Sequence, residues 1–103
     1  MINDMNSVAL EGTVVGDVFI SEKDDKKAMN FMLRCDRFID GRMESWMHPI
    51  VAWNYVAEKH LDDVKDGVYV RIRGHLQNGS FEKEDGKRIT YSKVCADKIE
   101  VDE

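Results

Sequence analysis

The chain has 103 residues, of which 43% are hydrophobic and 34% charged, so it can form one globular domain with a modest core. It has no apolar run near the roughly 18 residues of a membrane-crossing helix, and residues 1–4 lack the basic and apolar stretches of a secretion signal. We therefore expect a cytoplasmic protein with no membrane partner. The net charge of −5 by itself argues against a simple nucleic-acid binder.

The chain begins with a predicted strand over residues 6–15, in which apolar and polar side chains alternate, and residues 18–21 continue it. Gly12 and Gly16 predict bulges or bends, which a strand needs if its sheet is to close into a barrel. The charged residues 22–27 then predict a loop or turn.

A hairpin is predicted next. Residues 28–38 alternate as a second strand, and Asp40-Gly41 is typical of a hairpin turn. The third strand covers residues 43–53. Because Pro49 cannot donate a ladder hydrogen bond, we expect either an edge or a bulge at this point.

A helix is predicted over residues 54–64. Asn54 is a good N-cap, and the residues that follow carry a narrow apolar stripe at helical spacing. Asp66-Gly67 should end the helix and turn the chain.

Two more strands complete the chain. Residues 68–74 alternate strictly and predict a strand, residues 84–87 predict a hairpin tip, and residues 88–101 predict the last strand with a bulge near Cys95. A mostly β chain with glycines in or beside most of its strands must close or stack to hide its strand edges. The order predicts an all-β fold, a five-stranded Greek-key OB-fold barrel with one helix between strands 3 and 4, as a single domain over residues 1–103.

Positive charge is concentrated in two segments of this acidic chain. Residues 27–42 carry four lysines and arginines against two aspartates, a net of +2, and residues 67–93 carry six against three acidic residues, a net of +3. The rest of the chain sums to −10. The local field decides where a polyanion binds, so these segments supply candidate phosphate contacts, although a solvated strand face is the alternative for each. The candidates are Arg34, Arg71, Arg73, Arg88 and Lys93.

The sequence gives little support for metal binding or catalysis. Cys35 and Cys95 lie far apart in strand-like segments, and we expect two buried free thiols in a reducing compartment. His48, His60 and His75 are scattered, and neither cysteine has a partner at ligand spacing. Motifs for a nucleophile or a phosphate loop are absent too. We expect no metal, no cofactor and no enzymatic activity.

The stretch from Trp46 to Glu58 places three aromatic residues around a short apolar run, with a spacing unlike that of a core. Aromatic rings together with positive charge on a sheet are the chemistry of a surface that stacks bases and holds phosphates.

Several short pieces of the chain, in their order and spacing, are typical of one family. They are residues 5–12, 30–33, 50–54, 57–58 and 66–67, then Val70, Ile72, Gly74 and Leu76, and residues 80–87 and 94–101. With these pieces the chain resembles the bacterial single-stranded DNA-binding protein family over nearly its whole length. The resemblance implies an OB fold and a homodimer or homotetramer that binds single-stranded DNA in replication, repair or recombination.

The family stacks bases on a few aromatic residues, and the resemblance carries this role to four positions. Trp53 follows the apolar run of the third strand, Trp46 opens that strand, Phe81 lies in the last hairpin and Phe38 ends the second strand. Trp46 and Trp53 are seven residues apart, where the family usually has six. Two residues seven apart share a face only if the strand bulges, and Pro49 offers a place for a bulge.

Structural roles remain open for these aromatic residues. Trp53 and Trp46 could instead belong to the core or to a subunit interface, whereas a ring at Phe81 in a charged hairpin has no folding rationale. Tyr69 and Tyr91 stay ambiguous, because a tyrosine on a sheet surface often serves an oligomer interface.

The family usually has a long tail with an acidic tip that recruits replication and repair proteins. This chain stops at Asp102-Glu103. In its length and in Pro49 it is similar to primosomal replication protein N, a short relative without that tail. We therefore expect any protein partners to dock on the folded body. The alternative reading of the whole chain is an OB-fold protein-interaction module without DNA binding, which the acidic balance favours.

Overall fold

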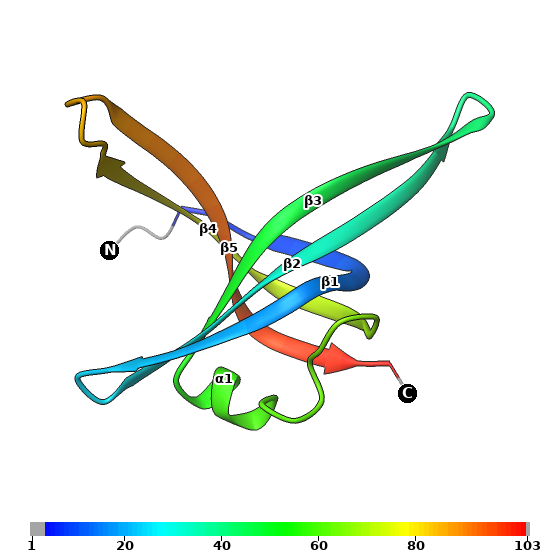
Figure 1. Ribbon diagram of the computed structural model, residues 1–103. Coiled ribbons are helices and arrows are strands. Elements are labelled where there is room, and N and C mark those ends of the chain that lie inside the picture. Colours follow the sequence, from blue (N-terminus) through cyan, green and yellow to red (C-terminus); the bar gives the residue numbers. More distant parts are fainter. Residues whose placement is uncertain (1–3, 103) are drawn as a thin grey trace.

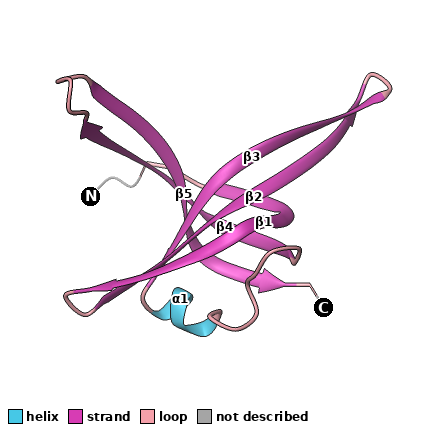
Figure 2. Ribbon diagram, in the orientation of Figure 1, coloured by secondary structure: helices cyan, strands magenta, loops and turns pink. Residues whose placement is uncertain are grey.

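The computed structural model describes residues 4–102, which form a closed barrel of five strands with one short helix at its base (Figures 1 and 2). The elements are β1 (Val8–Lys23), β2 (Lys26–Ile39), β3 (Arg42–Trp53), α1 (Tyr55–Lys59), β4 (Tyr69–Glu82) and β5 (Arg88–Val101). The order around the barrel is β1-β2-β3-β5-β4. The predicted five-stranded barrel, with its helix between the third and fourth strands, is therefore confirmed. Residues 1–3, which belong to the segment expected to lack a secretion signal, and Glu103 lie outside the described residues.

The core is formed by the inward side chains of all five strands. Alternation along β2 buries Met29, Phe31 and Leu33, and alternation along β4 buries Val70 and Ile72, as the sequence predicted. Burial of these side chains stabilises the barrel by roughly 1.5–3 kcal/mol for each large apolar residue.

Three hairpins extend outward from the barrel as twisted ribbons, β1–β2, β2–β3 and β4–β5 (Figure 1). The barrel closes through a short parallel contact, in which β3 pairs with β5 only at Ile50↔Val94 and Val51↔Cys95. Beyond this contact the β2–β3 and β4–β5 ribbons separate, so their outer parts present two faces to solvent.

Pro49 lies at an edge and not in a bulge. β2 and β3 pair in one unbroken register from Ala28↔Trp53 to Ile39↔Arg42, with Pro49 opposite Met32. The bulge that would have brought Trp46 and Trp53 to one face is absent from this pairing. The proline is tolerated because β3 has no partner on its second side before Ile50, so a missing N–H breaks no ladder.

Two bulges are present elsewhere. The β1–β2 register shifts between Val15 and Phe19, around Gly16 with its φ of 82°, as its glycine predicted. The β4–β5 register shifts at Gly74, which is opposite Ala96 while Arg73 is opposite Lys98. This second shift is the bulge predicted near Cys95.

The helix is shorter than predicted. α1 covers only Tyr55–Lys59, and the backbone from His60 to Val64 continues as turns. Asn54 does not cap the helix with its side chain, because its Oδ1 accepts a hydrogen bond from the Lys27 N–H at 3.0 Å. The Asn54 side chain therefore links the end of β3 to the start of β2. Within residues 4–102, no helix has both the length and the apolar character to cross a membrane.

The predicted loop at residues 22–27 is mostly strand. β1 runs to Lys23 and β2 starts at Lys26, so only Asp24 and Asp25 form the turn. Both have positive φ, 51° and 64°, which is the conformation of a two-residue hairpin turn that aspartate tolerates.

Candidate nucleic-acid interface

A row of aromatic and cationic side chains lies on the outside of the barrel across three strands. Trp53 ends β3, Tyr91 and Lys93 lie on β5, and Phe81 lies near the end of β4. Each points outward because its sequence position alternates with inward residues of the same strand. Tyr91 pairs with Gly79 and Lys93 with Gln77, so the outward side chains of β4 and β5 are neighbours.

A cleft of about 300 Å³ lies within this row. It is lined by Ser21, Ala28, Asn30, Val51, Trp53, Gln77, Asn78, Tyr91 and Lys93. Ala28, Val51 and Cys95 form a small buried cluster on the same outer side, separate from the main core. The lining therefore combines rings, amides and one ammonium group, and none of these nine residues is acidic.

Lys93 and Tyr91 are in contact inside the cleft. The Lys93 Nζ lies 5.4 Å from the centre of the Tyr91 ring and donates a hydrogen bond of 3.3 Å to Asn30 Oδ1. Among residues 4–102, no carboxylate oxygen lies within 4.0 Å of this ammonium group. The Phe81 ring centre lies 6.3 Å from that of Tyr91, tilted by 40°. Three groups that can bind a nucleotide are therefore side by side.

Sequence reasoning left the role of Tyr91 open. Its two-residue spacing from Lys93 did place both on one face of β5, but only the pairing with β4 brings Phe81 and Gly79 beside it. Tyr69 lies on another side of the barrel, where its hydroxyl donates to Glu11 Oε2 at 3.2 Å.

The two remaining predicted rings lie on the β2–β3 ribbon. Phe38, 70% exposed, is opposite Met43 near the tip and has the same strand parity as the outward residues of β2. Trp46 is opposite Cys35, on the parity of the buried residues Leu33 and Ile50. Trp46 and Trp53 therefore point to opposite faces of β3, and the structure does not bring them together.

The predicted arginines do not gather in the cleft. Arg34 lies on β2 with its Nε 3.2 Å from Asp36 Oδ1, and the Arg71 Nε lies 3.5 Å from Glu11 Oε1. Arg73 pairs in the sheet with Ala9 and Lys98, away from Trp53.

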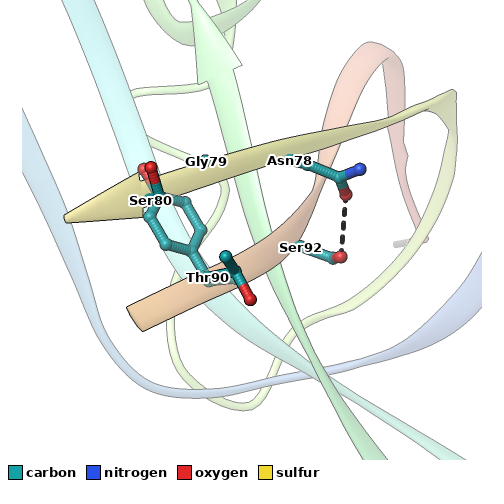
Figure 3. A pocket seen from close by; sticks show the side chains of 6 residues that line it. Asn78, Gly79, Ser80, Thr90 and Ser92 are labelled. Atoms are coloured by element: carbon teal, nitrogen blue, oxygen red, sulfur yellow. Dashed lines mark hydrogen bonds between the residues drawn. The ribbon is translucent and has the colours of Figure 1, made fainter. Parts of the chain in front are cut away.

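Arg88 points to the reverse face of the β4–β5 ribbon, where its Nη1 donates to Ser80 Oγ at 3.1 Å. This face carries small hydroxyl and amide groups, and Ser92 donates to Asn78 there at 2.9 Å (Figure 3). Of the five cationic candidates, Lys93 alone lines the cleft with Trp53.

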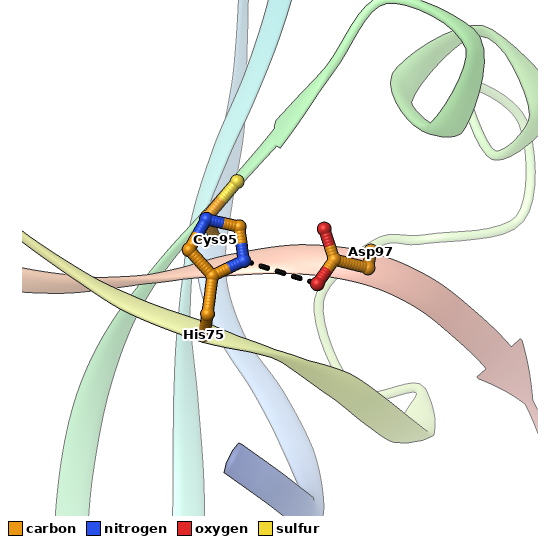
Figure 4. Close-up of side chains that lie close together, drawn as sticks. All are labelled: His75, Cys95 and Asp97. Atoms are coloured by element: carbon orange, nitrogen blue, oxygen red, sulfur yellow. Dashed lines mark hydrogen bonds and ion pairs between the residues drawn. The ribbon is translucent and has the colours of Figure 1, made fainter. Parts of the chain in front are cut away.

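His75, Cys95 and Asp97 form the one group of possible metal ligands found within residues 4–102 (Figure 4). The sequence did not show it, because His75 and Cys95 meet directly across β4 and β5. His75 Nδ1 already lies 3.0 Å from Asp97 Oδ2, and its Nε2 lies 3.2 Å from Gln77 Nε2. Burial, and then the Asp97 charge, raise the pKa of the Cys95 thiol and favour its protonated form. Both ring nitrogens of His75 therefore already have a hydrogen-bond partner.

The two cysteines are free, as expected. Cys95 is buried, but Cys35 is only half-buried, because it lies where the β2–β3 ribbon begins to leave the barrel. The expectation of two buried thiols was therefore wrong for Cys35.

A closed OB-type barrel with exposed rings across β3, β4 and β5 defines a class of nucleic-acid-binding domains. The model of the single-strand binding protein family matches residues 5–102, so this chain belongs to that family. Its resemblance to bacterial single-stranded DNA-binding proteins is thereby confirmed.

Two relatives and one solved structure show the extent of the similarity. The chain is 30% identical over 99 residues to a single-stranded DNA-binding protein of Clostridium tetani, covering 92% of this chain and 68% of the relative. It is 25% identical over 104 residues to single-stranded DNA-binding protein 2 of Chlorobaculum tepidum, covering 94% and 70%. A solved complex of Plasmodium falciparum SSB with ssDNA has the same fold, with a TM-score of 0.83 at 16% identity over 98% of this chain and 96% of that one.

Proposed function

We propose that this protein binds single-stranded DNA with little sequence preference, in replication, repair or recombination. The observation that carries the proposal is the outward row of Trp53, Tyr91 and Phe81 with Lys93 beside it. Stacking on an aromatic ring contributes roughly 1–3 kcal/mol per base, and every base has a ring face, so this mode of binding tolerates any sequence. The role is one of binding without catalysis.

The binding path starts at the cleft. Trp53 lines the cleft, and Phe81 on β4 lies beside Tyr91 at the border of the cleft. These two rings are therefore the first choice for stacking. Phe38 lies on the outward parity of β2 and extends the path along the β2–β3 ribbon. Trp46 points to the opposite face of the β2–β3 ribbon, so it contacts DNA only if the DNA strand passes over the edge of that ribbon.

Lys93 is the first choice for a phosphate contact, because it lines the cleft and no carboxylate in residues 4–102 neutralises it. Arg34 lies on the outward face of β2 and is the second choice for a phosphate contact, although its ion pair with Asp36 partly neutralises its charge. Arg71, Arg73 and Arg88 would contact phosphates only on DNA that continues around the barrel.

We also propose a homodimer or homotetramer. In β1 the residues from Val8 to Gly12 pair with β4, whereas pairing with β2 begins at Thr13, so one edge of this segment is open. An open edge pairs readily with the same edge of a second copy, which would hide it and join two clefts. Light scattering at micromolar concentration tests this: a mass of about 12 kDa would contradict it.

The proposed function is tested by titrating the protein with an oligo-dT strand while tryptophan fluorescence is recorded. Trp46 and Trp53 are 44% and 43% exposed, which leaves ring surface for a base. Stacking quenches the fluorescence, so we expect saturable quenching and a mobility shift at low salt. An OB-fold module that binds only proteins would give neither, and that result would overturn the proposal.

A further inference from the structure

The Tyr91 ring lies across a position where the neighbouring strand has no side chain. A Cβ on Gly79 would come within 2.4 Å of the Tyr91 Cζ and hydroxyl oxygen and within 2.8 Å of its Cε2. Such separations are far below van der Waals contact, so any other residue at position 79 would displace the ring. Gly79 therefore allows the end of the ring to rest on the β4 backbone.

The tyrosine remains accessible in this position. Its residue surface is 41% exposed, and it belongs to the lining of the cleft together with Trp53. An aromatic ring whose end rests on a strand while part of its surface stays exposed has the geometry of a stacking platform, because little side-chain freedom is left to lose when a base binds. The Lys93 ammonium lies over this ring, so a base would share the exposed surface with it.

The groups around the ring suit the other parts of a nucleotide. The Lys93 ammonium lies 5.4 Å from the ring centre, close enough to meet a phosphate attached to a base that is stacked there. The amides of Asn30, Gln77 and Asn78 line the same cleft. Each amide can both donate and accept hydrogen bonds, so this lining can meet the edge of any base.

We propose that Tyr91, supported by Gly79 and flanked by Lys93, is a binding position for one nucleotide of single-stranded DNA, with the base stacked on Tyr91 and its phosphate on Lys93. The inference rests on the proposed function and adds to it a ring that the family resemblance did not identify. Phe81, 6.3 Å away, then holds the neighbouring base.

The test compares the affinity of purified variants for a fluorescein-labelled oligo-dT strand by anisotropy at low salt. Tyr91→Ala should bind roughly 5- to 150-fold more weakly, which is the range of one lost stacking contact. Tyr91→Phe keeps the ring and should bind like the wild type. Tyr55→Ala is the matched control, because Tyr55 is a 76% exposed tyrosine on α1 that does not line the cleft.

Gly79→Ala tests the support separately. It removes no ring, yet its methyl group displaces Tyr91, so we expect weaker binding than wild type with all aromatic residues present. Wild-type affinity in both Tyr91→Ala and Gly79→Ala would overturn the inference while leaving DNA binding itself intact. Absence of binding by the wild type would instead overturn the proposed function.

A direct readout covers the case in which a variant fails to fold. The wild-type protein is photo-crosslinked to an oligonucleotide that contains 5-iodo-2′-deoxyuridine, and the adducts are located by peptide mass spectrometry. We expect an adduct on Tyr91. Adducts confined to Trp53, Phe81 or other residues would contradict a base on this ring.

Discussion

Two sides of the same barrel carry positive charge in different ways. On the side of the cleft, Lys93 lies among an aromatic ring and amide groups. On the side formed by β1, β4 and β5, Arg71 lies 3.5 Å from Glu11, and Lys98 lies 3.1 Å from Glu100. The second side has more charged residues, but Arg71 and Lys98 are each paired with a carboxylate, and of its cations Arg73 alone has no ion pair within residues 4–102.

The charged side also differs in its hollow and in the ionisation of its carboxylates. Its hollow of about 200 Å³ is bordered by side chains of both signs, and the hydrogen bond from Lys98 holds the pKa of Glu100 below its ordinary value. Glu11 also accepts a hydrogen bond from the Tyr69 hydroxyl. The comparison teaches that the count of cations in a segment does not locate a polyanion site, because the partners of each cation decide how much field remains.

The largest effect should come from the rings of the cleft side. Trp53→Ala and Phe81→Ala should each weaken oligo-dT binding by about 1–3 kcal/mol, because each loses a stacked base. Phe81→Ala should keep its thermal stability better, since Phe81 is 53% exposed on a ribbon outside the core. Binding is measured by anisotropy and stability by thermal melting. Unfolding by Phe81→Ala with normal residual binding would show that this ring is structural.

A smaller effect should follow from matched charge removal. Lys93→Gln should weaken binding and reduce the slope of log K against log salt by about 0.7, the value for one phosphate contact on a single strand. Arg71→Gln should leave the slope unchanged, because Glu11 already neutralises that guanidinium. The measurement is a salt titration of both variants beside the wild type. A larger loss of slope in Arg71→Gln would reverse the roles of the two sides.

The two tryptophans provide a comparison within one strand. Because Trp46 points to the reverse face of β3, Trp46→Ala should weaken binding less than Trp53→Ala. The same pair should differ in fluorescence: Trp46→Phe should keep most of the quenching by oligo-dT, and Trp53→Phe should lose most of it. Equal losses in both variants would mean that DNA passes over both faces of the β2–β3 ribbon.

The smallest effect should come from Glu11→Gln on the charged side. The change removes a half-exposed ion pair with Arg71, which contributes about 0–1 kcal/mol to stability. We expect a small fall in melting temperature and no gain in DNA affinity, although Arg71 is freed. Tighter binding at low salt would show that DNA reaches this side of the barrel.

The sequence by itself determined the elements that depend on near neighbours. Alternation along residues 28–38 and 68–74 identified the inward residues of β2 and β4, because side chains on a strand alternate with a period of two. Asp40-Gly41 identified the turn between β2 and β3, and the order of the elements predicted the barrel class. The family likeness added the rings on which the proposal began.

The tertiary structure alone decided what depends on pairing between distant residues. The unbroken β2–β3 register placed Trp46 and Trp53 on opposite faces, where the sequence left a bulge at Pro49 open. The use of the Asn54 side chain by Lys27, 27 residues away, removed the N-cap that the sequence predicted.

Pairing of β4 with β5 likewise decided the composition of the candidate site. It brought Gly79 under Tyr91 and turned Arg88 to the face opposite Phe81, although Arg88 and Phe81 are only seven residues apart in the sequence. Which face a strand residue takes is a local property, but which residues meet across strands is set by register and barrel closure. That is why the sequence could predict candidate stacking residues, and only the barrel shows which of these candidates lie side by side.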